Sequence, residues 1–99
     1  MARTLYGRLM DSATDVLGRK INLYLNSYKH IMNTHNRIEL WVKHWKRVIE
    51  TVKPDKNNYY EDLLENGEKI QIRVVKNSEE YLIKTAIMRK GVITKWKRT

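Results

Sequence analysis

The sequence contains no cysteine and no phenylalanine, and only one proline and four glycines among its 99 residues. Without cysteine, the chain has no disulfide, no thiolate zinc site and no cysteine nucleophile. Its glycines are scattered singly, so it has no glycine-rich phosphate-binding loop, and we expect no cofactor. No apolar run reaches the roughly 18 residues of a membrane span. These absences predict a soluble intracellular protein.

Metal ligands are also sparse. The three histidines, His30, His35 and His44, do not share a helix face at i, i+4 spacing. Neighbouring acids such as Glu61 and Asp62 point apart on either a strand or a helix. We expect no metal site and interpret these residues as solvated surface. The length predicts one domain, residues 1–99, and leaves the oligomeric state open.

Positive charge is abundant and unevenly placed. The net charge is +9. Residues 82–99 contain six bases and no acid, whereas residues 55–81 contain seven acids and four bases. A polarised basic surface attracts polyanions before any specific contact forms. We therefore expect either a nucleic acid or an acidic protein surface as the partner.

Helical periodicity dominates the first half of the chain. Apolar residues three and four positions apart predict amphipathic helices over Leu5–Leu17, Arg19–Asn33 and Arg37–Lys53. The last two are joined by a short polar turn and form a predicted αα-hairpin. Leu23 and Leu40 are the two residues that fall off the apolar stripes.

Two segments allow a second interpretation. Ser12 and Asp15 resemble a capping box, which would start a long helix at Ala13 and leave Thr4–Met10 free to form a strand. Tyr59–Glu65 could form a strand before a two-residue Asn-Gly loop, but that pairing places Glu61 in the core. We favour helices at both positions.

Apolar alternation after Pro54 predicts strands. A two-residue loop at Asn77–Ser78 brings two runs into register. The predicted pairs are Val74 with Tyr81, Ile72 with Ile83, and Ile70 with Thr85. A loop over Arg89–Gly91 then leads to a third strand, Val92–Lys97. The sequence thus predicts an α+β fold in which N-terminal helices with an αα-hairpin pack on a C-terminal antiparallel three-stranded meander.

The candidate nucleic-acid-binding residues lie on this meander. Bases that flank an aromatic residue on a strand are typical of single-strand binding, because they combine phosphate neutralisation with stacking. The candidates are Arg73, Lys84, Arg89, Lys90, Lys95, Trp96, Lys97 and Arg98. The alternative is that Trp96 packs into the core and that the cations protect an edge strand.

The helix over Arg37–Lys53 is a weaker candidate. Trp41 and Trp45 lie one turn apart on its apolar stripe, which favours a role as core anchors. Lys43, Lys46 and Arg47 lie on its exposed face, where Glu39 and Glu50 are spaced to pair with the two lysines. Arg47 is then the freer cation.

The length, the heavy use of Lys, Ile, Tyr and Asn, and charge-rich segments such as Asp62–Lys69 and Lys95–Arg98 resemble the small basic proteins of lipothrixviruses and rudiviruses. These are filamentous viruses of hyperthermophilic archaea. The resemblance implies an unusual α+β fold, tolerance of heat and acid, and a place in the host cytoplasm. It carries over no catalytic residue.

We therefore predict a non-enzymatic protein that binds nucleic acid without reading its sequence. A protein-interaction module that binds an acidic host factor is the alternative, since the same charge would speed that association. A metal-independent ribonuclease is the second alternative. Tyr81, Arg73, Arg89 and His44 are the residue types that could position a 2′-hydroxyl and stabilise a phosphorane.

Overall fold

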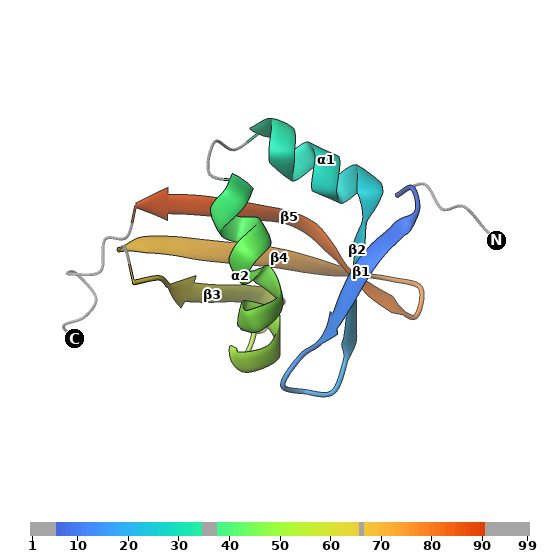
Figure 1. The fold of residues 1–99 in the computed structure, drawn as a ribbon. Coiled ribbons are helices and arrows are strands. Elements are labelled where there is room, and N and C mark those ends of the chain that lie inside the picture. The colour runs from blue at the N-terminus through green and yellow to red at the C-terminus, as the bar shows by residue number, and fades with distance from the viewer. Residues whose placement is uncertain (1–5, 35–37, 66, 91–99) are drawn as a thin grey trace.

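The chain forms five strands and two helices in a computed structural model that describes residues 6–34, 38–65 and 67–90 (Figure 1). In chain order these are β1 (Leu9–Thr14), β2 (Lys20–Tyr24), α1 (Leu25–Thr34), α2 (Ile38–Thr51), β3 (Tyr59–Leu63), β4 (Glu68–Asn77) and β5 (Glu80–Lys90). The strands form one sheet in the order β1-β2-β5-β4-β3. The α+β class is confirmed. The predicted architecture is wrong, because two helices and a five-stranded sheet replace three N-terminal helices and a meander.

The helix predicted over Leu5–Leu17 is wrong, because β1 occupies its described part. β1 and β2 form an antiparallel hairpin with Ala13 opposite Ile21, which also rules out a helix starting at Ala13. Ile21 and Leu23 both belong to the core cluster, as alternate residues on one face of a strand do, and Asn22 and Tyr24 are buried outside that cluster. Leu23, the residue off the helical stripe, was therefore a signal of strand alternation. The helix predicted over Arg19–Asn33 divides into β2 and α1.

The third predicted helix is confirmed as α2, which ends before Pro54. Trp41 and Trp45 are buried, with ring centroids 6.1 Å apart, so their predicted role as core anchors is confirmed. Val42 is exposed although it belongs to the predicted apolar stripe. The segment that joins α1 to α2 lies outside the described residues.

The short helix predicted over Tyr59–Glu65 is also wrong, since this segment contains β3, which pairs antiparallel with β4. A two-residue loop would have placed Glu61 opposite Ile72. The observed connection between β3 and β4 is one residue longer than that predicted loop. Leu64, and not the residue after it, pairs with the first residue of β4, to whose carbonyl the Leu64 N–H donates a 2.7 Å hydrogen bond. This extra residue puts Tyr60, which is fully buried, opposite Ile72.

β4 and β5 form the predicted hairpin in a different register. The turn occupies Ser78 and Glu79, with Ser78 at a φ of 62°, and not Asn77–Ser78. Lys84 is then inserted as a β-bulge. The observed pairs are Val74 with Ile83, Ile72 with Ala86, and Ile70 with Met88. All three predicted pairs were wrong because the loop position shifts the register, and the bulge shifts the pairs of Ile72 and Ile70 by one further residue.

The predicted loop over Arg89–Gly91 is wrong for its first two residues, since Arg89 and Lys90 belong to β5. The predicted third strand, Val92–Lys97, lies outside the described residues.

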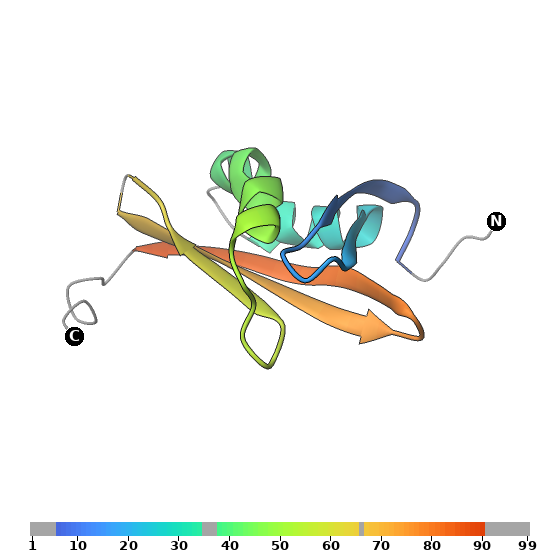
Figure 2. The same cartoon turned by 90° about the horizontal axis from the view of Figure 1, so that it is seen from below.

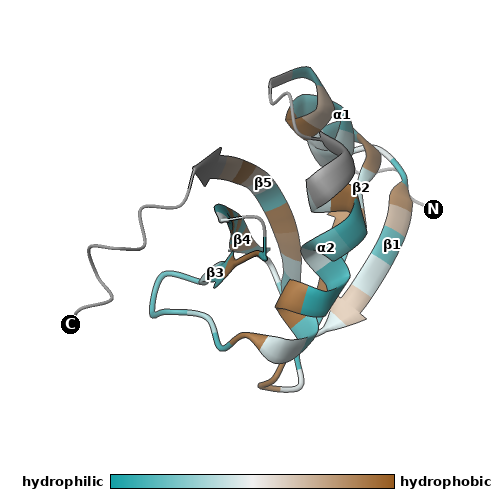
Figure 3. Ribbon diagram, turned by 60° about the vertical axis from the view of Figure 1, so that its left-hand side comes forward, coloured by the Kyte–Doolittle hydropathy of each residue, from teal (hydrophilic) through white to brown (hydrophobic). Residues whose placement is uncertain are grey.

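The hydrophobic core lies on the side of β3–β5 that the helices and the β1–β2 hairpin cover (Figure 2). Hydrophobic segments of β5 and α2 contribute to it (Figure 3). The other side of β3–β5 is called the outer face here. No described helix lies across it in Figure 2, and α1 approaches it only along the edge at β5. Strand alternation and register assign to it Tyr59, Glu61, Leu63, Lys69, Gln71, Arg73, Val75, Leu82, Thr85 and Ile87.

Candidate nucleic-acid interface

Arg73 is the candidate residue whose surroundings the structure defines best. It is exposed on β4 and lies opposite Tyr59 of β3. The Cζ atom of Arg73 is 5.5 Å from the centroid of the Tyr59 ring. A guanidinium over an aromatic ring at an exposed site contributes about 0.5–1 kcal/mol. The pair places a phosphate-binding cation against an aromatic ring on the outer face.

Lys84 is exposed at the bulge of β5. The next residue, Thr85, is the strand partner of Arg73, so the bulge brings the two cations near one another on neighbouring strands. Bulges change the direction of a side chain relative to a regular strand. Among the described residues, neither Arg73 nor Lys84 forms an ion pair.

The structure gives less information on the surroundings of the other candidate residues. By backbone register, Arg89 lies opposite Lys69 and Lys90 lies opposite Glu68. The C-terminal candidates Lys95, Trp96, Lys97 and Arg98 all lie outside the described residues. The described part of the predicted interface is therefore the Arg73 and Lys84 region of the outer face.

Charge at the other end of the outer face is locally balanced. Lys69 Nζ lies 3.4 Å from Glu61 Oε1, and the Gln71 amide donates a hydrogen bond to the same carboxylate. Because the charge of Lys69 is already partly neutralised by Glu61, Arg73 is the more available cation for binding a phosphate group.

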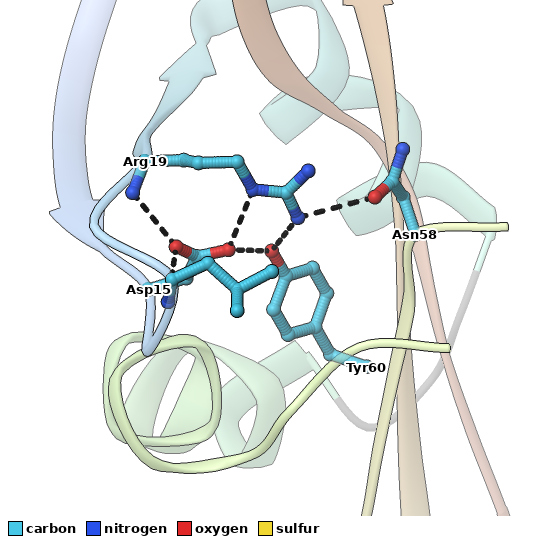
Figure 4. A network of polar contacts seen from close by, with 5 residues as sticks. Asp15, Arg19, Asn58 and Tyr60 are labelled. Atoms are coloured by element: carbon cyan, nitrogen blue, oxygen red, sulfur yellow. Dashed lines mark hydrogen bonds and ion pairs between the residues drawn. The ribbon is translucent and has the colours of Figure 1, made fainter. Parts of the chain in front are cut away.

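A buried polar network, separate from the outer face, joins the β1–β2 turn to β3 (Figure 4). Asp15 Oδ1 accepts hydrogen bonds from the backbone N–H groups of Leu17 (3.0 Å) and Arg19 (2.8 Å). Asp15 Oδ2 accepts from Arg19 Nε at 3.0 Å and from the Tyr60 hydroxyl at 2.6 Å. The Arg19 Nη2 group donates to Tyr60 Oη at 3.0 Å and to Asn58 Oδ1 at 3.1 Å.

The network changes the ionisation of its members. Burial alone would raise the pKa of Asp15, but the hydrogen bonds from Tyr60 and Arg19 outweigh it and lower that pKa. Burial and the bond to Asp15 raise the pKa of Tyr60. Burial opposes the charge of Arg19, yet its bond to Asp15 leads the contributions that raise its pKa. Asp15 therefore stays ionised, and Tyr60 stays protonated.

Such a saturated network is suited to holding structure. Asp15 accepts four hydrogen bonds, and Tyr60 both donates and accepts, so the geometry fixes the turn against β3. The sequence prediction missed it because it assigned this segment to a helix, in which Asp15 would not reach a turn partner such as Arg19 and a distant Tyr60 together. The available signal was an Asp three residues before Gly18, a common turn pattern.

The exposed face of α2 differs from the prediction. Arg47, predicted as the freer cation, pairs with Asp62 at 2.9 Å. Lys46 pairs with Asp11 of β1 at 3.3 Å, and not with a glutamate of its own helix. His44 Nδ1 lies 3.3 Å from Arg47 Nη2 beside a hollow of about 530 Å³ between α2 and the end of β3.

Three of the residues considered for a ribonuclease, Arg73, Tyr81 and His44, lie in different parts of the described structure. Arg73 lies on the outer face, whereas Tyr81 packs against the core, with the Arg19 guanidinium 4.4 Å from its ring centroid. His44 lies on α2, on the covered side of the sheet. No group of three metal-ligating side chains occurs within residues 6–34, 38–65 and 67–90. No helix in these ranges is long and apolar enough to cross a membrane.

The chain was compared with protein-family models, curated proteins and solved structures, and none of them matches it.

Proposed function

We propose that the chain is a non-enzymatic protein that binds single-stranded nucleic acid without reading its sequence. The observation that carries this proposal is the position of Arg73 over Tyr59 on the outer face. The guanidinium suits a phosphate and the ring suits a base, which is the combination that single-strand binding uses. Among the described residues, no acidic group pairs with Arg73 and competes for that phosphate.

Lack of sequence preference follows from the same chemistry. Every base has a face that can stack on an aromatic ring, and phosphate contacts carry no sequence information. The net charge of +9 supports rapid association with a polyanion. Lys84, beside Arg73, supports a second phosphate contact.

The test measures binding of labelled RNA and DNA, single- and double-stranded, over a series of salt concentrations. In an Arg73→Gln, Lys84→Gln double variant, two phosphate contacts are lost. The slope of log affinity against log salt for single strands should then fall by about 1.4. Tyr59→Ala should weaken single-strand binding by about 1–3 kcal/mol without changing the slope, because a stacking ring releases no counterions.

A matched control removes the same charge elsewhere. Lys43 and Lys53 are exposed in and just after α2, away from the outer face. A Lys43→Gln, Lys53→Gln double variant should keep the wild-type slope. Equal losses of slope in the two double variants would mean that only net charge matters and would contradict an outer-face site.

Protein binding is the second candidate function, and one observation favours it. Four apolar side chains are exposed on the edge strand β1 and the turn after it: Leu9, Met10, Val16 and Leu17. An unprotected edge strand with apolar side chains can pair with another chain. Absence of nucleic-acid binding at low salt would make this candidate, with an acidic protein as the partner, the leading one.

The proposed setting is the cytoplasm of an archaeal host infected by a filamentous virus. The support is the sequence resemblance described above. A protein from such a setting should have a melting temperature above about 90 °C. Unfolding at an ordinary temperature of about 45–65 °C would argue against that origin.

A further inference from the structure

A groove between α1 and β5 adjoins the outer face. β2 pairs with β5 only at Tyr81 and Leu82, so the rest of β5 is free of β2. α1 lies beside this part of β5 (Figure 1). The space between them is a cavity of about 330 Å³, which is called the α1–β5 groove here. Its lining includes Tyr6, Ser27, Val75, Leu82, Lys84 and Thr85.

The groove is continuous with the proposed binding surface. Val75 and Arg73 are alternate residues of β4 and share the outer face. Lys84 lines the groove and also belongs to the proposed phosphate contacts. A chain of nucleotides held at Arg73 and Lys84 would therefore pass the mouth of the groove.

The lining combines an apolar floor with polar groups on the α1 side and the β5 side: Asn26, Ser27 and His30 come from α1, and Lys84 and Thr85 from β5. Leu82 is 1% exposed, and its strand partner Val75 is half-buried. Ser27 is 8% exposed, and its hydroxyl makes no hydrogen bond to any described residue. Ser27 therefore contributes to the lining a hydroxyl group that can both donate and accept a hydrogen bond.

These features select the kind of ligand. The cavity is at the small end of the range for ligand sites, about 300–1,000 Å³. An apolar floor favours a flat ring, the Ser27 hydroxyl needs a polar ring edge, and Lys84 favours a phosphate attached to that ring. A nucleobase in a strand has all three properties.

We propose that the α1–β5 groove receives one unstacked base of a bound single strand. This inference rests on the proposed function and adds to it a physical reason for preferring single strands. A base in a duplex is paired and stacked, so it must first be extruded before it can enter such a site. Since a hydroxyl can donate to one base and accept from another, the groove remains compatible with binding any sequence.

The first experiment compares two ligands by amide NMR. One is a single-stranded thymidine nonamer, and the other is the same nonamer with an abasic site at its centre, which has the same charge. Both should shift the Arg73 resonance, while the intact nonamer should shift those of Ser27 and Leu82 more. Equal shifts of Ser27 and Leu82 with the two ligands would overturn the inference.

The second experiment fills the groove. Ser27→Leu should reduce affinity for the nonamer about tenfold, because a stacked base is lost, and should leave the salt slope unchanged. Ser27→Ala removes the hydroxyl without filling the space and should have a smaller effect. Thr85→Leu fills the groove from β5 and provides the same test if Ser27→Leu does not fold, as a thermal melt would reveal.

The outcomes separate this inference from the function on which it rests. If filled variants bind the nonamer as tightly as the wild type while the Arg73 and Lys84 variants lose salt slope, the groove assignment is wrong and the outer-face function stands. If the wild type retains none of the nucleic acids, the proposed function fails before any groove variant is tested.

Discussion

The Tyr60 hydroxyl donates a 2.6 Å hydrogen bond to Asp15 Oδ2, which links β3 to the β1–β2 turn across 45 positions of sequence. The same hydroxyl accepts a hydrogen bond from Arg19. One phenol therefore completes the partners of a buried carboxylate and of a partly buried guanidinium.

Replacing Tyr60 with Phe should lower the free energy of unfolding by about 1–3 kcal/mol, because both partners lose a hydrogen bond at a buried position. Urea unfolding at neutral pH measures the loss. Tyr59→Phe is a matched control, since the same atom is removed from the preceding residue, whose hydroxyl bonds to no described residue. A similar loss in both variants would contradict a special role for the Tyr60 hydroxyl.

The stability of the protein should depend on the ionisation of Asp15. Burial raises the pKa of Asp15, but the hydrogen bonds from Tyr60 and Arg19 lower it by more than burial raises it. The pKa of Asp15 in the folded protein therefore lies below its value in the unfolded chain. The stabilisation is therefore present above the unfolded pKa of about 3.9 and is lost as the pH falls through the folded pKa.

Asp15→Asn tests this pH dependence. The variant should be less stable than the wild type at pH 7 by about 2 kcal/mol, because Arg19 loses its charged partner. The gap should narrow as the solution is acidified below about pH 4, because the unfolded wild type then takes up a proton at Asp15 while the folded carboxylate is still ionised. A gap that stays constant down to pH 2 would show that Asp15 does not contribute through its charge.

Gly7 and Gly18 offer a comparison of two glycines with positive φ, 87° and 83°. A Cβ atom at Gly7 would lie 3.1 Å from Asn26 Oδ1, whereas nothing lies within 4 Å of one at Gly18. Both alanine variants should lose about 1 kcal/mol through backbone strain. Gly7→Ala should lose more stability, because its new Cβ atom also crowds Asn26. Thermal melts of the two variants test this, and a lower melting temperature for Gly18→Ala would contradict it.

Deleting Lys84 should remove the bulge and preserve the fold. The pairs Val74 with Ile83 and Arg73 with Thr85 would then follow one another in a regular ladder, and Ala86 would keep its inner position. The deletion variant should melt cooperatively. If the bulge directs the lysine to phosphate, deletion and Lys84→Gln should both reduce the salt slope by about 0.7. Failure to fold would show that the bulge is needed for the twist of the sheet.

The C-terminal candidates can be tested in the same binding assay. Replacing Lys95, Lys97 and Arg98 with Gln should reduce the salt slope by about two units if all three contact phosphates. Trp96→Ala should weaken single-strand binding by about 1–3 kcal/mol and leave the slope unchanged. An unchanged slope in a folded triple variant would rule out phosphate contacts by this tail, and a lowered melting temperature of Trp96→Ala would favour the core interpretation of Trp96.

The sequence-based prediction of the fold was correct where the residues of a single segment indicated its structure without reference to other segments. α2 has a sustained helical period, and its two tryptophans share the buried face. β4 has strict alternation, so the inner positions Ile70, Ile72 and Val74 were identified even though their partners were not. Both patterns are local, and they survive errors in the assignment of neighbouring elements.

The prediction failed where short elements are ambiguous. β1 and β2 have six and five residues, and in such short runs apolar spacing can fit either period. In the candidate site, the outer-face position of Arg73 was predictable from alternation. Its contact with Tyr59 was not, because that contact requires β3 to be a strand paired in a register set by a longer loop.

The sequence by itself determined the α+β class, the helix α2, the inner face of β4, the absence of cysteine chemistry and the concentration of positive charge. Tertiary structure decided which strands pair, where Lys84 is inserted, and that Asp15 meets Tyr60. The physical reason is the distance along the chain between the residues that set each property. Periodicity and charge belong to single segments, whereas register and buried hydrogen bonds depend on turn lengths and on partners far away in the chain.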